Sequence, residues 1–521
     1  MSTVAMAPHA GPNDARRARL LLPAAALGAC GAGLLAGKLA ASQHPLTVFG
    51  LAGLLVPLAI WKWRQAGVFL LLGAATTVEQ FTYSAGMHPG VFTSHIPLYG
   101  GVTKGGGVSL LDLLLGLVFV FWLMRGVLDR SWGAPRSPVS RGLLALLALV
   151  VLAVGIGLSH GGKSQVILYE VRPWFYLSVA YLLAGSLLRT RAALRGVMWI
   201  FVIGTGFKAL QGVQMYIAVR HDPVPPEAIL AHEESFFFGL FLILTLSLWL
   251  FGVRGRLRTV ATWLAPAVLL ADMANARRTA WAIIGTTLIV LVCVAYSSLP
   301  EKRPALRRLL LIVAGVSAVY FPLFWNKAGI LAQPARSLHS MIAPDARDKS
   351  SNLYRVQENA NLAFNIRKTA SLGKGFGPLI DYAIPIVDIS KADAFITFLP
   401  HNSVLDLWMR LGIQGVVVFL LLMAAVVVRG CALARSGDRE LAVLGILAAC
   451  AVVAYLVQGY NDMGFFWFRI ALFFGTFLGA MEAAHRLVAR GGRGSGARRI
   501  ISGEQSTDWQ ESQLAPVQGE S

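Results

Sequence analysis

Runs of apolar residues, each close to the length of one membrane crossing, follow one another along most of this chain. A helix needs about 20 apolar residues to cross roughly 30 Å of hydrocarbon. About fourteen candidate spans approach this length, at residues 20–40, 46–60, 66–78, 109–124, 142–158, 174–188, 196–217, 235–252, 259–271, 280–299, 309–325, 405–428, 441–458 and 464–485. The pattern predicts an all-α, polytopic helical membrane protein with about 12–14 transmembrane helices and one large external loop.

The composition excludes a large soluble core and argues against nucleic-acid binding. Of the 521 residues, 56% are hydrophobic and only 14% are charged, whereas about 25% is usual in soluble domains. The net charge is +20, but the Lys and Arg residues are spread over short loops and do not form one basic face with interleaved aromatic residues. We therefore expect the lipid bilayer as a partner, and no nucleic acid.

Basic residues in every second loop predict the orientation of the chain. If the N-terminus is cytoplasmic, the basic loops all fall on the cytoplasmic side, as the positive-inside rule requires; they lie at 62–64, 125–141, 189–195, 254–258, 302–308, 429–439 and 486–499. This predicts a multi-pass protein of the bacterial inner (cytoplasmic) membrane with both termini cytoplasmic. The predicted organisation is a cytoplasmic segment 1–19, transmembrane helices in 20–325, a periplasmic loop 326–403, transmembrane helices in 404–485, and a disordered cytoplasmic tail 486–521.

The loop at 326–403 attracts attention because connections longer than about 12–15 residues are uncommon and usually functional. The four cysteines form no CxxC pair, and the chain holds no metal-ligand spacing, Walker loop or Ser-centred elbow. We therefore expect no metal and no cofactor.

Two adjacent arginines, Arg277 and Arg278, break the positive-inside pattern at the external start of a span. Arginine presents a planar fork of donors suited to phosphate oxygens, and the helix N-terminus adds its own positive end. A lipid pyrophosphate at the outer interface would fit both. Alternatively, the two side chains snorkel to lipid phosphates or pair with Glu233 or Glu234.

Other candidates lie on the same side of the membrane. Arg469 falls inside the last span, where a buried arginine needs a partner or a function; the structural alternative is a pair with Asp462 or with a helix carbonyl. His401 stands where the loop returns to the membrane and could act as a general base or hydrogen-bond donor, or be purely structural. The turn Gly373–Gly377 could cradle a phosphate or be a plain tight turn.

Four features in chain order resemble the O-antigen ligase and Wzy-type polysaccharide polymerase family of bacterial membrane glycosyltransferases. They are the helix start Ala276-Arg277-Arg278-Thr279, a large external loop with Arg355 near its middle and a basic stretch to Arg367, the Gly-x-Gly-x-Gly turn at 373–377, and the signature Pro-His-Asn-x-x-Leu-x-x-x-x-x-x-Gly-x-x-Gly from Pro400 to Gly415. The resemblance covers about residues 235–480.

The resemblance implies a metal-independent enzyme that moves a glycan from an undecaprenyl-pyrophosphate carrier to an acceptor hydroxyl at the outer face of the membrane. The implied partners are the lipid-linked glycan donor, a glycan or lipid acceptor, and other proteins of polysaccharide assembly in the cell envelope. The implied catalytic residues are His401, Arg278 and Arg355, with Arg355 preferred over Arg367 as the loop arginine. The candidate substrate-binding residues are Arg277, Arg367, Asn402, Glu233, Glu234 and Arg469.

Three alternatives stay open at the level of sequence. Polymerase and ligase share the same chemistry, and we favour a polymerase slightly because it needs no special acceptor. A secondary transporter would be expected to show paired broken helices and inverted repeats, which the sequence lacks. A non-catalytic component of a polysaccharide export complex would tolerate replacement of His401 and the loop arginines.

Overall fold

The computed structural model describes residues 47–80, 92–96, 98–99, 107–130, 132–222, 226, 228–387 and 398–501. Every regular element in this part of the chain is a helix. Nine of these helices are long and apolar enough to cross a membrane: α4 (Leu110–Leu128), α5 (Pro138–Ser159), α6 (Ser164–Leu187), α7 (Arg191–Val219), α9 (Arg256–Asn275), α10 (Arg278–Ser298), α11 (Arg303–Phe324), α14 (Ser403–Ala434) and α15 (Arg439–Asn461). The protein is an all-α polytopic membrane protein.

Further helices complete the bundle. Two shorter apolar helices are α3 (Ala66–Thr77) and α8 (Glu234–Leu250), and the first and last described helices are α2 (Thr47–Lys62) and α16 (Phe468–Ile501). Each predicted span that falls within the described ranges coincides with a helix, whereas the predicted span 20–40 lies outside them. The helix α16 continues to Ile501, past the predicted span end at residue 485, into the stretch we expected to be a disordered tail.

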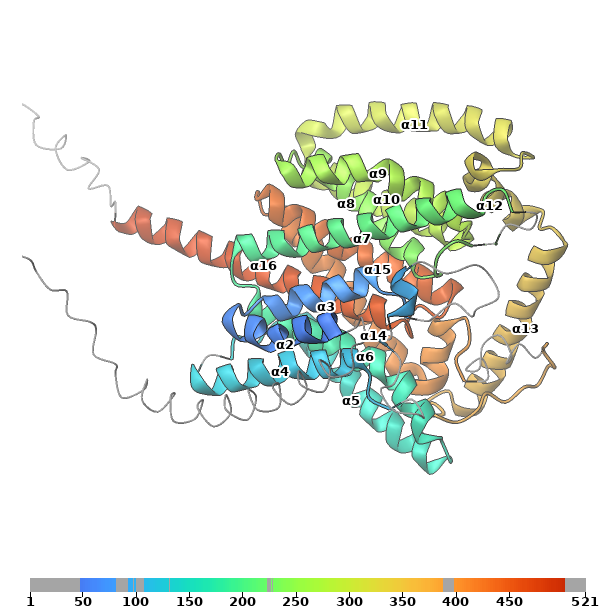
Figure 1. Cartoon of the computed structure of the whole chain (residues 1–521), viewed down its shortest axis with the longest axis horizontal. Helices are drawn as coiled ribbons and strands as arrows, with labels where there is room; N and C mark the ends of the chain where they lie inside the picture. The colour runs from blue at the N-terminus through green and yellow to red at the C-terminus, as the bar shows by residue number, and fades with distance from the viewer. Residues whose placement is uncertain are drawn as a thin grey trace, which may run out of the picture.

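The centre of the bundle is formed by α15 and α16, with α6 packed along α16 (Figure 1). Glycines allow this close approach: a Cβ at Gly475 would lie 2.2 Å from the carbonyl oxygen of Leu177, and one at Gly479 would lie 2.5 Å from that of Tyr181. Small residues at such contacts are typical of helix pairs in membranes, because they let two backbones approach.

The first half of the predicted loop 326–403 is largely helical. It contains η3 (Ile330–Ala332), α12 (Gln333–Ile342) and α13 (Ala346–Thr369), and α13 begins where the Asp345 side chain accepts a hydrogen bond from the Asp348 amide (2.8 Å). In Figure 1, α13 runs across the ends of the spanning helices at the right. We call this end of the bundle the loop end.

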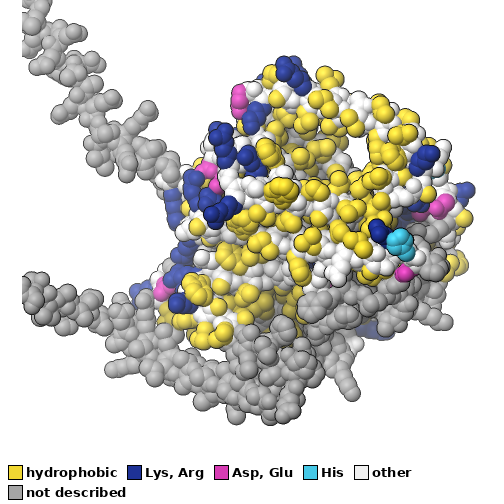
Figure 2. Space-filling model, turned by 45° about the horizontal axis from the view of Figure 1, so that its top comes forward, with side chains coloured by type: hydrophobic (Ala, Val, Ile, Leu, Met, Phe, Trp, Pro, Cys, Tyr) yellow, Lys and Arg dark blue, Asp and Glu magenta, His cyan; other side chains and the backbone are white. Residues whose placement is uncertain are grey.

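The two ends of the bundle differ in charge. On the face drawn in Figure 2, hydrophobic side chains cover the middle, and most Lys and Arg side chains gather toward the left edge. This edge is the end opposite α13. The distribution agrees with the alternating basic loops in the sequence.

The helix α14 is kinked at Gly412, one of the two glycines of the sequence signature. Gly412 has φ +70° inside the helix, a conformation that glycine adopts without strain. A Cβ at this position would lie 2.2 Å from the carbonyl oxygen of Ser371. The signature glycine therefore serves the packing of the returning loop against α14.

Candidate functional site

His401 lies just before α14 and is held by two side chains of α13. Its Nδ1 is 3.2 Å from Glu358 Oε1, and its backbone N–H donates to Glu358 Oε2 (3.1 Å). The ring of Tyr354, one helical turn before Glu358, meets the imidazole edge-on at 5.7 Å between centroids. Glu358 is buried, while 22% of the His401 side chain is exposed. The carboxylate fixes the ring through Nδ1 and leaves Nε2 for another partner.

Three more residues complete what we call the His401 cluster. Arg355 donates from Nη1 to the carbonyl oxygen of Asn461 (2.7 Å), and His232 Nδ1 lies 3.0 Å from Asp462 Oδ2. Both His401 and Arg355 act electrostatically on Asp462. The cluster thus joins His401, from the segment before α14, to Tyr354, Arg355 and Glu358 of α13, to His232 before α8 and to Asp462 at the end of α15.

Burial and charge act in opposite directions on the titration of this cluster. Burial lowers the pKa of His401, but the hydrogen bond and charge of Glu358, helped by Asp462, outweigh it and raise the pKa above its ordinary value of 6.5. Burial raises the pKa of Asp462, but the effects of His232, His401 and Arg355 bring it below its ordinary value. Asp462 is therefore an anion, and His401 stays protonated to a higher pH than a free imidazole.

The two arginines at the start of α10 reach the same end of the bundle. Arg278 donates from Nη2 to Asn352 Oδ1 (3.2 Å), and its Nη1 lies 4.0 Å from Asp348 Oδ2. Asn352 precedes Arg355 by about one turn of α13. Arg277 is the half-buried N-cap residue of α10. The arrangement therefore brings Arg278 against the helix that carries Arg355, and their shared catalytic role stays a prediction.

Two other predicted site residues of the loop, Asn402 and Arg367, lie in different surroundings. The Asn402 side chain caps α14 by accepting a hydrogen bond from the Leu405 amide (3.1 Å) and is buried. Arg367 is exposed in the last turn of α13. The structure thus gives Asn402 a capping function beside His401, whereas Arg367 does not join the cluster. Substrate binding by either residue stays a prediction.

The turn at 373–377 is built for packing. Its amides are occupied: Lys374 donates to Met409 O (2.6 Å), Gly375 to Arg410 O (3.1 Å), Phe376 to Ala153 O (3.1 Å) and Gly377 to Glu170 Oε2 (2.6 Å). Gly373, Gly375 and Gly377 all have positive φ. A turn whose amides already have partners cannot cradle a phosphate with them, so the tight-turn alternative fits the structure.

The substitution Gly375→Ala should destabilise the protein strongly. A Cβ there would lie 2.2 Å from the Gly157 backbone nitrogen, and the φ of +79° adds about 1–2 kcal/mol for a residue with a side chain. The matched control is Gly285→Ala in α10, where a Cβ meets nothing within 4 Å and alanine should stabilise the helix by roughly 0.5–1 kcal/mol. Thermal unfolding of the purified variants measures both effects, and equal midpoints would contradict the packing argument.

Glu233, Glu234 and Arg469 form an ion network that no solvent reaches. Arg469 Nη1 donates to Glu233 Oε1 (2.9 Å) and Glu234 Oε1 (2.5 Å), and all three side chains are fully buried. Lys208 of α7, paired with Glu79, extends the network, which we call the buried network. Arg469 also donates from Nε to a helix carbonyl, that of Ala75 (2.8 Å). Of the two structural partners expected for Arg469, the structure shows a helix carbonyl, and Glu233 and Glu234 take the place of Asp462.

Glu358 and Tyr354 belong to the cluster although neither stands out in the sequence. Their signal is the periodicity of α13, whose buried positions Glu358, Asn361, Leu362, Asn365 and Ile366 repeat at helical spacing. Recognising that part of the loop as a helix would have placed Tyr354 and Glu358 on one face.

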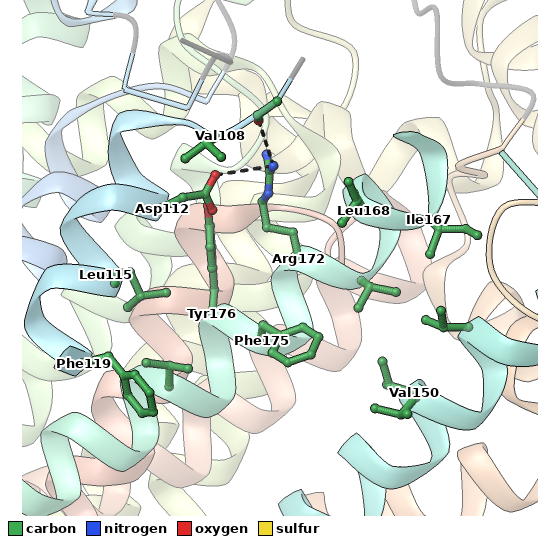
Figure 3. Close-up of a pocket in the computed structure, with 16 residues that line it drawn as sticks. Val108, Asp112, Leu115, Phe119, Val150, Ile167, Leu168, Arg172, Phe175 and Tyr176 are labelled. Atoms are coloured by element: carbon green, nitrogen blue, oxygen red, sulfur yellow. Dashed lines mark hydrogen bonds and ion pairs between the residues drawn. The ribbon is translucent and has the colours of Figure 1, made fainter. Parts of the chain in front are cut away.

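An apolar cavity of about 630 Å³ lies apart from this cluster, between α4, α5 and α6 (Figure 3). At one end, Arg172 Nη2 is 3.4 Å from Asp112 Oδ2, and Tyr176 donates to Asp112 Oδ1 (2.5 Å). The walls are apolar and include Leu115, Phe119, Val150, Ile167, Leu168 and Phe175. No residue of the His401 cluster lines the cavity, and its polar groups are already paired with one another.

Within the described ranges, no three His, Cys, Asp or Glu side chains are grouped so that they could hold a metal ion. Compared with protein-family models and with curated proteins, the chain matches none.

Proposed function

We propose that this protein is a membrane glycosyltransferase that moves an oligo- or polysaccharide from an undecaprenyl-pyrophosphate carrier to an acceptor hydroxyl at the outer face of the bacterial inner membrane. The observation that carries the proposal is the His401–Glu358 pair, 3.2 Å apart, beside Arg355 at the loop end of a membrane-spanning bundle. The gathering of basic side chains at the opposite end supports an outward-facing loop end.

In the proposed reaction, the acceptor hydroxyl oxygen attacks the anomeric carbon of the donor glycan. A new C–O bond forms there, the bond from that carbon to the pyrophosphate oxygen breaks, and its electron pair leaves with the lipid pyrophosphate. His401 takes the hydroxyl proton on Nε2, because Nδ1 faces Glu358. The Glu358 carboxylate stabilises the resulting imidazolium and keeps the ring oriented.

The leaving group gains negative charge as the bond breaks, so it needs cations that are already in place. Arg355 and Arg278 are suited to this because both guanidinium groups sit on or against α13, at the end of the bundle where His401 lies. Arg277, at the N-terminus of α10, adds a further cation beside the positive end of a helix. An arginine fork can contact two pyrophosphate oxygens at once.

The same step serves a polymerase, whose acceptor is another lipid-linked glycan, or a ligase, whose acceptor is a different molecule. We favour the polymerase because it needs no dedicated acceptor site. The test is to place the purified protein in nanodiscs with lipid-linked glycan extracted from the native host. Free undecaprenyl pyrophosphate together with longer lipid-linked chains supports a polymerase. Transfer that requires a separate acceptor supports a ligase, and intact donor in both cases contradicts the proposal.

The Glu358→Gln variant should shift the pH profile of transfer. A general base works deprotonated, so activity falls as the pH drops through the pKa of His401. Because Glu358 raises that pKa, its replacement by an uncharged amide should move the acidic limb to lower pH. The plateau rate should also fall, because the ring loses its orienting carboxylate. Initial rates between about pH 5 and 9 would show both effects.

The matched control is Glu482→Gln, which removes a carboxylate paired with Arg429 outside the cluster and should leave the limb in place. If His401 acted as a cationic donor to phosphate, activity would instead fall as the pH rises, and Glu358→Gln would move this alkaline limb downward. That result would overturn the assignment of His401 as the base.

A further inference from the structure

The buried network holds one more negative charge than positive. Its carboxylates are Glu79, Glu233 and Glu234, and its cations are Lys208 and Arg469. Glu79 is 2% exposed and the other four residues are 0% exposed. A charge without compensation is costly in the interior of a protein and more so at membrane depth, so such groups are normally paired or neutralised.

Lys208 uses all its donors within the network, whereas Arg469 donates from Nε and Nη1 and leaves its buried Nη2 without a hydrogen-bond partner among the described residues. Lys208 Nζ donates to Glu79 Oε1, to Thr93 Oγ1 (2.8 Å) and to Gln211 Oε1 (3.3 Å), which uses its three protons. Arg469 Nη1 is shared between Glu233 Oε1 and Glu234 Oε1. Each carboxylate is therefore held through one of its two oxygens.

Within the described part of the chain, the second oxygen of each carboxylate has no hydrogen-bond partner. Oε2 of Glu79, of Glu233 and of Glu234 are all buried and accept no hydrogen bond. Buried carboxylate oxygens without a donor are rare because each one carries a full desolvation penalty. The missing charge and the unpartnered oxygens occur in the same group of residues, which points to a positively charged ligand.

We propose that the buried network binds one additional monovalent cation, a proton or an alkali-metal ion, at the unpartnered oxygens of Glu79, Glu233 and Glu234. One such charge makes the network neutral: three carboxylates are then balanced by Lys208, Arg469 and the bound cation. A proton would sit on one Oε2 and donate to a neighbouring oxygen, while an alkali ion would be coordinated by several of them. The inference concerns charge balance and does not depend on the proposed glycosyl transfer.

Among the side chains that the structure describes, no further cation is paired with the network. Tyr99 lies close enough to the network for its charges to act on the phenol and donates to the carbonyl of Ala74. Of the other described titratable groups, His232 and Asp462 pair with each other, Arg172 of α6 pairs with Asp112, and Asp272 of α9 lies near Ser235. His232 directly precedes Glu233, so the network adjoins the His401 cluster.

The test compares wild type with three single variants, Glu79→Gln, Glu233→Gln and Glu234→Gln, as the full-length protein in nanodiscs. Glutamine has the shape of a protonated glutamate, so at least one variant should keep or raise the unfolding temperature. The double variant Glu79→Gln/Glu234→Gln leaves an excess positive charge and should unfold at a lower temperature than either single variant.

Ligand dependence distinguishes the two cations. Unfolding temperatures are measured with sodium, potassium or choline at fixed ionic strength, and over a pH series. A wild-type midpoint that rises with sodium or potassium but not with choline identifies an alkali ion, since a ligand of the native state stabilises it. A midpoint that rises as the pH falls, in choline alone, identifies a proton. In either case, the neutral single variants should lose the dependence.

The control is Glu482→Gln, which disrupts a two-residue ion pair with Arg429 joined by hydrogen bonds of 2.5 and 2.7 Å. It should lower the midpoint and leave the cation and pH dependence as in wild type. If all three network variants lowered the midpoint and showed the same cation and pH dependence as wild type, the network would bind no extra cation and the proposal would be wrong.

Discussion

The His401→Ala variant should lose glycan transfer while remaining folded in the membrane. A positioned general base contributes about 10²–10⁴-fold to rate, and alanine removes the only group of residue 401 that can accept the proton. The side chain is partly exposed and its main contact is with Glu358, so the effect on stability should be modest. The measurement is a sizing gel of lipid-linked and surface glycans from the native host, with protein levels confirmed.

The pattern of loss would also separate the two proposed reactions. Single lipid-linked repeats that accumulate without long chains indicate a polymerase, whereas long chains that stay on the carrier indicate a ligase. His339→Ala is the matched control, because His339 lies on α12 of the same loop, packed against Trp325 and outside the cluster. An unchanged glycan profile would take catalysis away from His401 and favour a transporter or a non-catalytic component.

The spans could be predicted from sequence because a lipid-facing helix must be apolar along its length. The start of α6 shows where this reasoning fails. We predicted that this span starts at residue 174, because Glu170 and Arg172 interrupt the apolar run. The helix in fact begins at Ser164. Both side chains are compensated by distant partners, Arg410 and Asp112 respectively. Ion pairs between helices balance these charges inside the protein. Because the partners are far apart in the sequence, no local pattern predicts the pairs.

The residues of the candidate site also fall into those that the sequence predicted and those that only the structure reveals. His401 and Asn402 could be found because the signature around them is contiguous, and Arg355 because a resemblance marked the loop. Glu358 contacts His401 only because α13 folds back over the bundle. His232 contacts Asp462 although the two residues are 230 positions apart in the sequence. Such contacts are set by tertiary packing, so sequence spacing could not group these residues.

The Arg410→Met variant should fail to fold stably, with a loss of at least about 3–5 kcal/mol. Arg410 is fully buried, its Nη2 lies 2.6 Å from Glu170 Oε1, and its Nε lies 3.4 Å from Asp406 Oδ1. Methionine has a similar length but leaves both carboxylates without their cation. The guanidinium also donates to three carbonyls of the returning loop, those of Gly375, Pro378 and Phe398.

Arg410→Lys should be almost as damaging, because a lysine is a point charge and cannot reach acceptors on several sides as the guanidinium fork does. Arg367→Met is the matched control, since Arg367 is exposed at the end of α13. Yield of folded protein and unfolding temperature in detergent measure the difference. If Arg410→Met and Arg367→Met unfolded at the same temperature, Arg410 would not hold the loop. A large gap would mean that one buried side chain holds Gly375, Pro378 and Phe398, the last of which lies three residues before His401, so that the candidate site depends on this ion cluster for its geometry.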